Sequence, residues 1–210
     1  MFKKILEELK HHAPFTVFGA LTGIVIMIFF HSLPEKVSFN AFYVFHPLHV
    51  LLSALVTASM YELHRCGGMK IKCNIWALLL IGYVGSVGIA TLSDSVIPYL
   101  GETLLNMPHR EIHLGFIEKW YIVNPLAILG IAIAYFRPRT KFPHAGHVLL
   151  STWASLFHVL MAMGSRLSWV SYIGVFVFLF FAVWVPCCVS DIVFPLLFVK
   201  EENTALHPHH

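Results

Sequence analysis

The sequence predicts an all-α integral membrane protein of six transmembrane helices, arranged as two inverted-topology repeats of three helices each. Three observations support this fold class. Of the 210 residues, 58% are hydrophobic and only 12% are charged; long apolar stretches recur along the chain; and a polar motif occurs twice. An average soluble domain is about 25% charged. So low a charge content excludes a soluble enzyme, a nucleic-acid-binding protein and a disordered chain.

Six stretches are long enough to cross the hydrocarbon core as helices, which takes about 20 apolar residues each. They follow an amphipathic segment, residues 1–12, that we expect on the cytoplasmic membrane surface. Residues 13–104 form the first predicted three-helix repeat, 105–200 the second, and 201–210 a histidine-containing cytoplasmic tail. The predicted spans are Phe15–Phe30, Val37–Tyr61, Ile75–Leu100, Leu114–Phe136, Phe142–Met163 and Trp169–Val199.

Basic residues predict the orientation, because cytoplasmic loops carry an excess of Lys and Arg. With six spans, one side of the membrane holds ten of them and the other holds four, so both termini are predicted to be cytoplasmic. Cys66 and Cys73 then lie in a cytoplasmic loop, where thiols stay reduced. The ten are Lys3, Lys4, Lys10, Arg65, Lys70, Lys72, Arg137, Arg139, Lys141 and Lys200, against Lys36, Arg110, Lys119 and Arg166.

An internal duplication divides the chain into two halves. HPLHVLLS at His46–Ser53 and HAGHVLLS at His144–Ser151 agree at six of eight positions, at an offset of 98. SDSVIPYL at Ser93–Leu100 and SDIVFPLL at Ser190–Leu197 agree at five of eight, at an offset of 97. Each half has three spans, so the second must enter the membrane inverted. Secondary transporters use this architecture, although fold alone does not fix function.

The duplicated polar residues predict two equivalent sets of metal ligands. His residues at i and i+3 share one helical face, and Ser53 and Ser151 continue it, with Thr57 and Ser155 one turn further. Two imidazoles and a carboxylate suit Zn²⁺, Fe²⁺, Co²⁺, Ni²⁺ or Mn²⁺. A hydrogen-bond network between helices or a proton relay would use the same residues. The outer set is His46, His49 and Asp94, and the inner set is His144, His147 and Asp191.

Other candidate residues fall outside the duplication. His158 shares a face with His147, but its counterpart is Met60, so it either completes the outer set or is a buried core histidine. The loop between spans three and four is a candidate capture site or simply a solvated loop. Cys187 and Cys188 are interpreted as packing residues rather than ligands for a soft metal. The loop cluster comprises His109, Glu111, His113 and Glu118.

These patterns favour a transporter for a divalent transition-metal cation over an enzyme. The expected partners are the lipid bilayer and a metal ion, with a second copy of the chain left open and nucleic acid excluded. One alternative is an intramembrane zinc-dependent hydrolase acting on a lipid, with His49, His147 and His158 as ligands and Asp94 as base. Another is a b-type cytochrome, with histidines of spans two and five holding haem.

Overall fold

The structure is a computed structural model, and it describes residues 2–30, 33–66, 73–138, 141–163, 168–189 and 193–198. Every regular element in these ranges is helical. In chain order they are α1 (Phe2–Phe30), α2 (Glu35–Arg65), α3 (Ile75–Tyr83), η2 (Val84–Gly88), α4 (Ile89–Thr91), η3 (Leu92–Val96), α5 (Ile97–Leu104), α6 (Gly115–Glu118), α7 (Trp120–Phe136), α8 (Lys141–Ala162), α9 (Trp169–Cys188) and α10 (Phe194–Leu196).

Five helical segments of the described chain are long and apolar enough to cross a membrane. The fourth predicted span, Leu114–Phe136, is divided into α6 and α7, because Lys119 between them leaves helical geometry (φ −122°, ψ 43°). α7 remains an apolar helix of 17 residues. The five segments are Ala13–Phe30, Glu35–Arg65, Ile75–Leu104, Ala145–Ala162 and Trp169–Cys187. This composition is compatible with a multi-pass membrane protein.

The distribution of side chains reverses that of a soluble protein. Large apolar side chains such as Phe29 and Val170 are exposed, while histidines, serines and carboxylates are buried among the helices. Exposed tryptophans stand at or next to the first residue of α3, α7 and α9: Trp76, Trp120 and Trp169. Trp is enriched at membrane–water interfaces. The outer surface of the bundle therefore suits contact with lipid, and the buried polar side chains lie inside the bundle.

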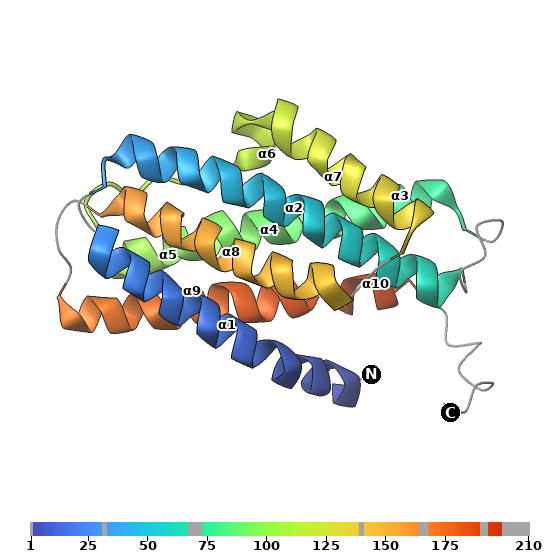
Figure 1. The fold of residues 1–210 in the computed structure, drawn as a ribbon, viewed down its shortest axis with the longest axis horizontal. Coiled ribbons are helices and arrows are strands. Elements are labelled where there is room, and N and C mark those ends of the chain that lie inside the picture. Colours follow the sequence, from blue (N-terminus) through green and yellow to red (C-terminus); the bar gives the residue numbers. More distant parts are fainter. Residues whose placement is uncertain are drawn as a thin grey trace.

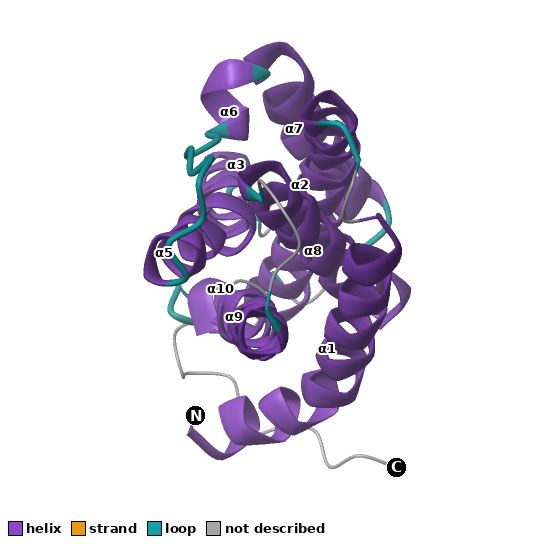
Figure 2. Cartoon of the chain, turned by 90° about the vertical axis from the view of Figure 1, so that its left-hand side faces the viewer, coloured by secondary structure: helices purple, strands orange, loops and turns teal. Residues whose placement is uncertain are grey.

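Helices α2 and α8 pack against each other and form the centre of the bundle (Figure 1). α7 covers α2 on one side, and α1 packs on α8 and α9 on the other. The view along the bundle shows α6 and α7 at the opposite edge from α1, with α2 and α8 between them (Figure 2). Each outer helix thus packs mainly on elements from the other half of the sequence.

The third span is helical from Ile75 to Leu104 but contains two π-helical segments, η2 and η3. A π-helical turn is wider than an α-helical turn, and such turns are frequent at functional sites. Three consecutive residues of η3, Ser93, Asp94 and Ser95, are all buried. Hydrophobic periodicity alone did not predict either π segment.

One local expectation is wrong and another stays a prediction. The position of residues 1–12 on the cytoplasmic membrane surface is untested, and α1 runs unbroken from Phe2 through Pro14. Cys66 and Cys73 were expected to be reduced, yet they form a disulfide with a Cα–Cα distance of 5.2 Å. Cys66 caps the end of α2 and Cys73 directly precedes Asn74, the N-cap of α3, so the two helix ends bring the sulfurs together. Disulfides form and persist mainly in oxidising compartments.

Candidate functional site

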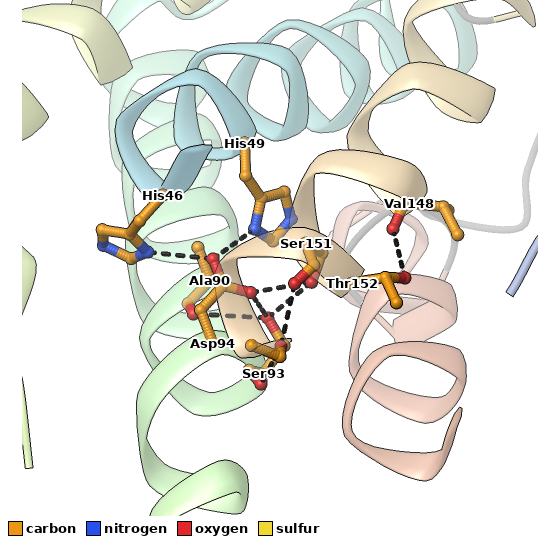
Figure 3. Close-up of polar contacts among 9 residues, drawn as sticks. His46, His49, Ala90, Ser93, Asp94, Val148, Ser151 and Thr152 are labelled. Atoms are coloured by element: carbon orange, nitrogen blue, oxygen red, sulfur yellow. Dashed lines mark hydrogen bonds and ion pairs between the residues drawn. The ribbon is translucent and has the colours of Figure 1, made fainter. Parts of the chain in front are cut away.

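The carboxylate of Asp94 lies at the centre of a buried polar cluster (Figure 3). Its Oδ2 atom accepts from two histidines of α2, at 2.9 Å from His46 Nδ1 and 2.7 Å from His49 Nδ1. Both rings are buried. They reach one oxygen because residues three apart on a helix lie on the same face. The structure thus brings together all three residues of the predicted outer set.

The other carboxylate oxygen, Asp94 Oδ1, binds two hydroxyls. Ser93 Oγ and Ser151 Oγ each donate to it at 2.7 Å. Ser155, one turn after Ser151 on α8, donates to the backbone carbonyl of Ser93 at 3.0 Å. Asp94 therefore ties α2 of the first half to α8 of the second half.

This pattern fixes which nitrogen of each ring is available. A carboxylate accepts only, so the Nδ1 atoms of His46 and His49 carry the hydrogens that point to Asp94. In a neutral imidazole of this tautomer, the Nε2 atom keeps its lone pair. The Nε2 atom of His46 is buried and has no hydrogen-bond partner among the described residues. Metal-binding histidines characteristically donate their other ring N–H to a carboxylate in this way.

His147 of α8 lies against His49 of α2. The two rings are stacked, with centroids 5.7 Å apart and planes 10° from parallel. Cys187 of α9 completes a buried group in which one ligand atom from each residue lies within 4.8 Å of the others. Cys187, predicted from the sequence to be a packing residue, also packs on Val148 and Val183.

The rest of the predicted inner set falls outside what the structure describes. His144 is on α8, but its side chain is outside the described part, and Asp191 lies outside the described residues. Ser53 and Thr57, the supporting residues on α2, are buried. The one inner residue whose side chain is described, His147, meets its own counterpart, His49.

His158 pairs with a carboxylate that sequence analysis did not single out. Its Nδ1 atom lies 2.7 Å from Glu102 Oε1, and both side chains are buried. Its ring also contacts Phe42 and His113, each with a centroid distance of 5.5 Å. Glu102 follows the predicted end of span three, Leu100, by two residues. Glu102 could have been noticed in the sequence, because it is an acidic residue within one turn of an apolar span.

Helix α6 covers the His46 end of the Asp94 cluster. A Cβ atom on Gly115 would lie 2.5 Å from both Cδ2 and Nε2 of His46, so only glycine fits there without displacing the ring. Glu118 accepts from the Tyr43 hydroxyl and the Leu114 N–H, and lies 3.3 Å from His113 Nδ1. Burial alone would raise the pKa of the Glu118 carboxyl, but these hydrogen bonds and the nearby His113 together lower it.

Comparison with known proteins gives no functional lead. No protein-family model, no curated protein and no solved structure matches the chain. The chemistry must therefore be argued from the site. A serine hydrolase needs a base on its nucleophile, but the Ser151 hydroxyl donates to Asp94 Oδ1 and to Ser93 Oγ, and among the described residues no histidine bonds to it. His158 binds Glu102 instead of joining His49 and His147 as a third ligand.

Proposed function

We propose that this protein is a membrane carrier for a divalent transition-metal cation. The central site is formed by His49 and His147, with the thiolate of Cys187 as a third ligand, and Asp94 orients His49. One observation carries the proposal: a buried, carboxylate-oriented histidine from one half of the chain faces its counterpart from the other half, beside a cysteine. Nitrogen and sulfur donors favour Zn²⁺ and its transition-metal neighbours over Mg²⁺ or Ca²⁺.

The six-span inverted repeat is part of this proposal. If α1, α2 and the α3–α5 segment correspond to α7, α8 and α9, each outer helix packs on the opposite half in the same manner. A residue near a two-fold axis meets its own counterpart, as His49 meets His147. The sequence offset of 98 between the two histidines supports the same correspondence.

The proposed carrier function follows from the placement of the site. A site shared by two inverted halves can be exposed to either side in turn when one half rocks against the other. Metal release is coupled to protons in any such site, because imidazole and thiolate bind metal only when deprotonated. An acidic compartment should therefore favour release.

The test is the metal content of the full-length protein purified in detergent, followed by uptake into liposomes. We expect bound Zn, Fe, Co, Ni or Mn, of which about one equivalent is lost in a variant carrying both His49→Ala and His147→Ala. His64→Ala is the matched control, because His64 is exposed on α2 and binds only the carbonyl of Met60 in the structure. Absence of metal after incubation with excess ions would overturn the proposal. Iron with a Soret band would replace it with the cytochrome.

Cytoplasmic termini also belong to the proposal, supported by the ten-to-four distribution of basic residues. The Cys66–Cys73 disulfide opposes this orientation, because the same loop would face the reducing side. Labelling with a membrane-impermeant thiol reagent in intact cells, before and after reduction, decides between them. Labelling that appears from outside only after reduction would reverse the orientation.

A further inference from the structure

We infer that His113 and His158 form a second binding site for a transition-metal cation, at the end of the bundle covered by the loop between α5 and α7. The inference rests on the proposed function for the identity of the cargo. It goes beyond that function by assigning a separate site of entry or exit. Neither residue takes part in the central group of His49, His147 and Cys187.

The first supporting observation is the orientation of both rings. His158 Nδ1 is bound to Glu102, and His113 Nδ1 faces Glu118. Each imidazole therefore has a carboxylate on Nδ1 and leaves Nε2 for a ligand, as His46 and His49 do around Asp94. The Nε2 atom of His158 is buried with no hydrogen-bond partner among the described residues. A buried nitrogen without a partner is costly, so a ligand there is favoured.

The second observation is the separation of the rings. Their centroids lie 5.5 Å apart and their planes meet at 68°. Two imidazoles that bind one Zn²⁺ through nitrogens at about 2.0–2.1 Å and a tetrahedral angle place their centroids about 5 Å apart. His113 and His158 are therefore close enough to share an ion after small side-chain shifts. Water can fill the remaining positions, as in zinc sites that keep an open position.

The third observation is the position of the pair relative to the central site. The Phe42 ring is completely buried and contacts His158 on one side, while it stacks on His46 at 5.2 Å. His158 and His147 are eleven residues apart on α8, which is about 16 Å along the helix axis. Two ions can thus be held at once, and Phe42 lies between His158 and His46 of the Asp94 cluster.

The pair also has access to water, unlike the central site. The side chain of His113 is 12% exposed, whereas those of His158 and Glu102 are buried. An ion that reaches His113 from the loop would meet His158 and Phe42 next, because both rings contact His113. This position makes the His113–His158 pair a loading or release position for the central site.

The test is a Zn²⁺ titration of the full-length protein in detergent, with bound metal counted after equilibrium dialysis. The wild type should bind two equivalents. His113→Ala and His158→Ala should each remove one equivalent, or weaken one at least tenfold, and keep the other. His109→Ala is the matched control, because His109 is an exposed histidine of the same loop. His113 is not buried in the bundle, so its variant decides the matter if His158→Ala does not fold.

The outcomes separate this inference from the proposed central site. If His113→Ala and His158→Ala both still bind two equivalents of Zn²⁺, the His113–His158 site is overturned. The wild type could instead bind a single equivalent that is removed by His49→Ala and by His147→Ala but not by His113→Ala. That result would also overturn the His113–His158 site, and it would retain the central site. A single equivalent that only His113→Ala and His158→Ala remove would support the His113–His158 site and overturn the central site.

Discussion

Asp94 and Glu102 are buried carboxylates on the same helical span, and each binds histidine through Nδ1, yet their surroundings differ. Both oxygens of Asp94 are occupied, because His46 and His49 bind one and Ser93 and Ser151 bind the other. Glu102 binds only His158, and its Oε2 atom is buried without a partner among the described residues. A fully bonded carboxylate can act as a fixed support, whereas a half-bonded one retains capacity for another partner.

The largest effect should follow from Asp94→Asn. The amide oxygen can still accept from the two histidine N–H groups, but the amide NH2 bonds the serine hydroxyls only if both hydroxyls turn to accept, and the negative charge is lost. Losing a hydrogen bond to a charged group costs about 1.5–3 kcal/mol, and losing an outer-shell carboxylate weakens metal affinity about 10- to 100-fold. Thermal unfolding and Zn²⁺ titration measure the two effects. Glu102→Gln serves as the comparison, and equal losses in both variants would contradict the distinction between these carboxylates.

A smaller effect is expected from Ser151→Ala, which removes one of the four hydrogen bonds to Asp94. A hydrogen bond to a charged group contributes about 1.5–3 kcal/mol. Thr152→Ala is the matched control, because the Thr152 hydroxyl bonds only the Val148 carbonyl of its own helix in the structure. Denaturant unfolding in detergent compares the two. The account fails at this point if Thr152→Ala is as destabilising as Ser151→Ala.

Gly115→Ala should disturb the same cluster from the loop side. The new methyl group would lie within 2.5 Å of the His46 ring, and overpacking of this kind costs about 1–3 kcal/mol. Gly88→Ala provides the control, since a Cβ there meets nothing within 4 Å. Thermal unfolding should show a loss for the first variant and no loss for the second. Equal stability of the two variants would show that α6 does not pack tightly against His46.

The sequence predicted the Asp94 cluster and missed the Glu102 pair for a physical reason. HxxH and Ser-Asp occur twice, and duplication of polar residues in apolar spans is rare enough to single out His46, His49 and Asp94. His158 and Glu102 occur once, so nothing in the pattern linked residues 56 positions apart. The contact of His147 with His49, and the inclusion of Cys187, depend on how α2, α8 and α9 pack. No periodicity encodes that packing.

The smallest effect concerns the loop and its pH dependence. The pKa of Glu118 is lowered in the folded protein, so its contribution to the stability of the loop is complete above the ordinary glutamate pKa. That contribution is lost as the pH falls through the lowered value. Chemical modification of His113 should accelerate in Glu118→Gln at neutral pH, because the imidazole loses its carboxylate partner. An unchanged modification rate would show that Glu118 does not hold His113.

The central claim is that His49 and His147 bind one ion together with Cys187. X-ray absorption spectroscopy of the zinc-loaded protein in detergent tests it most directly, because it distinguishes sulfur from nitrogen ligands. We expect a mixed shell with nitrogen at about 2.0–2.1 Å and one sulfur at about 2.3 Å. Cys187→Ser should lose the sulfur, and the variant with both His49→Ala and His147→Ala should lose the site. A shell of oxygen alone, or one that these variants leave unchanged, would contradict the account.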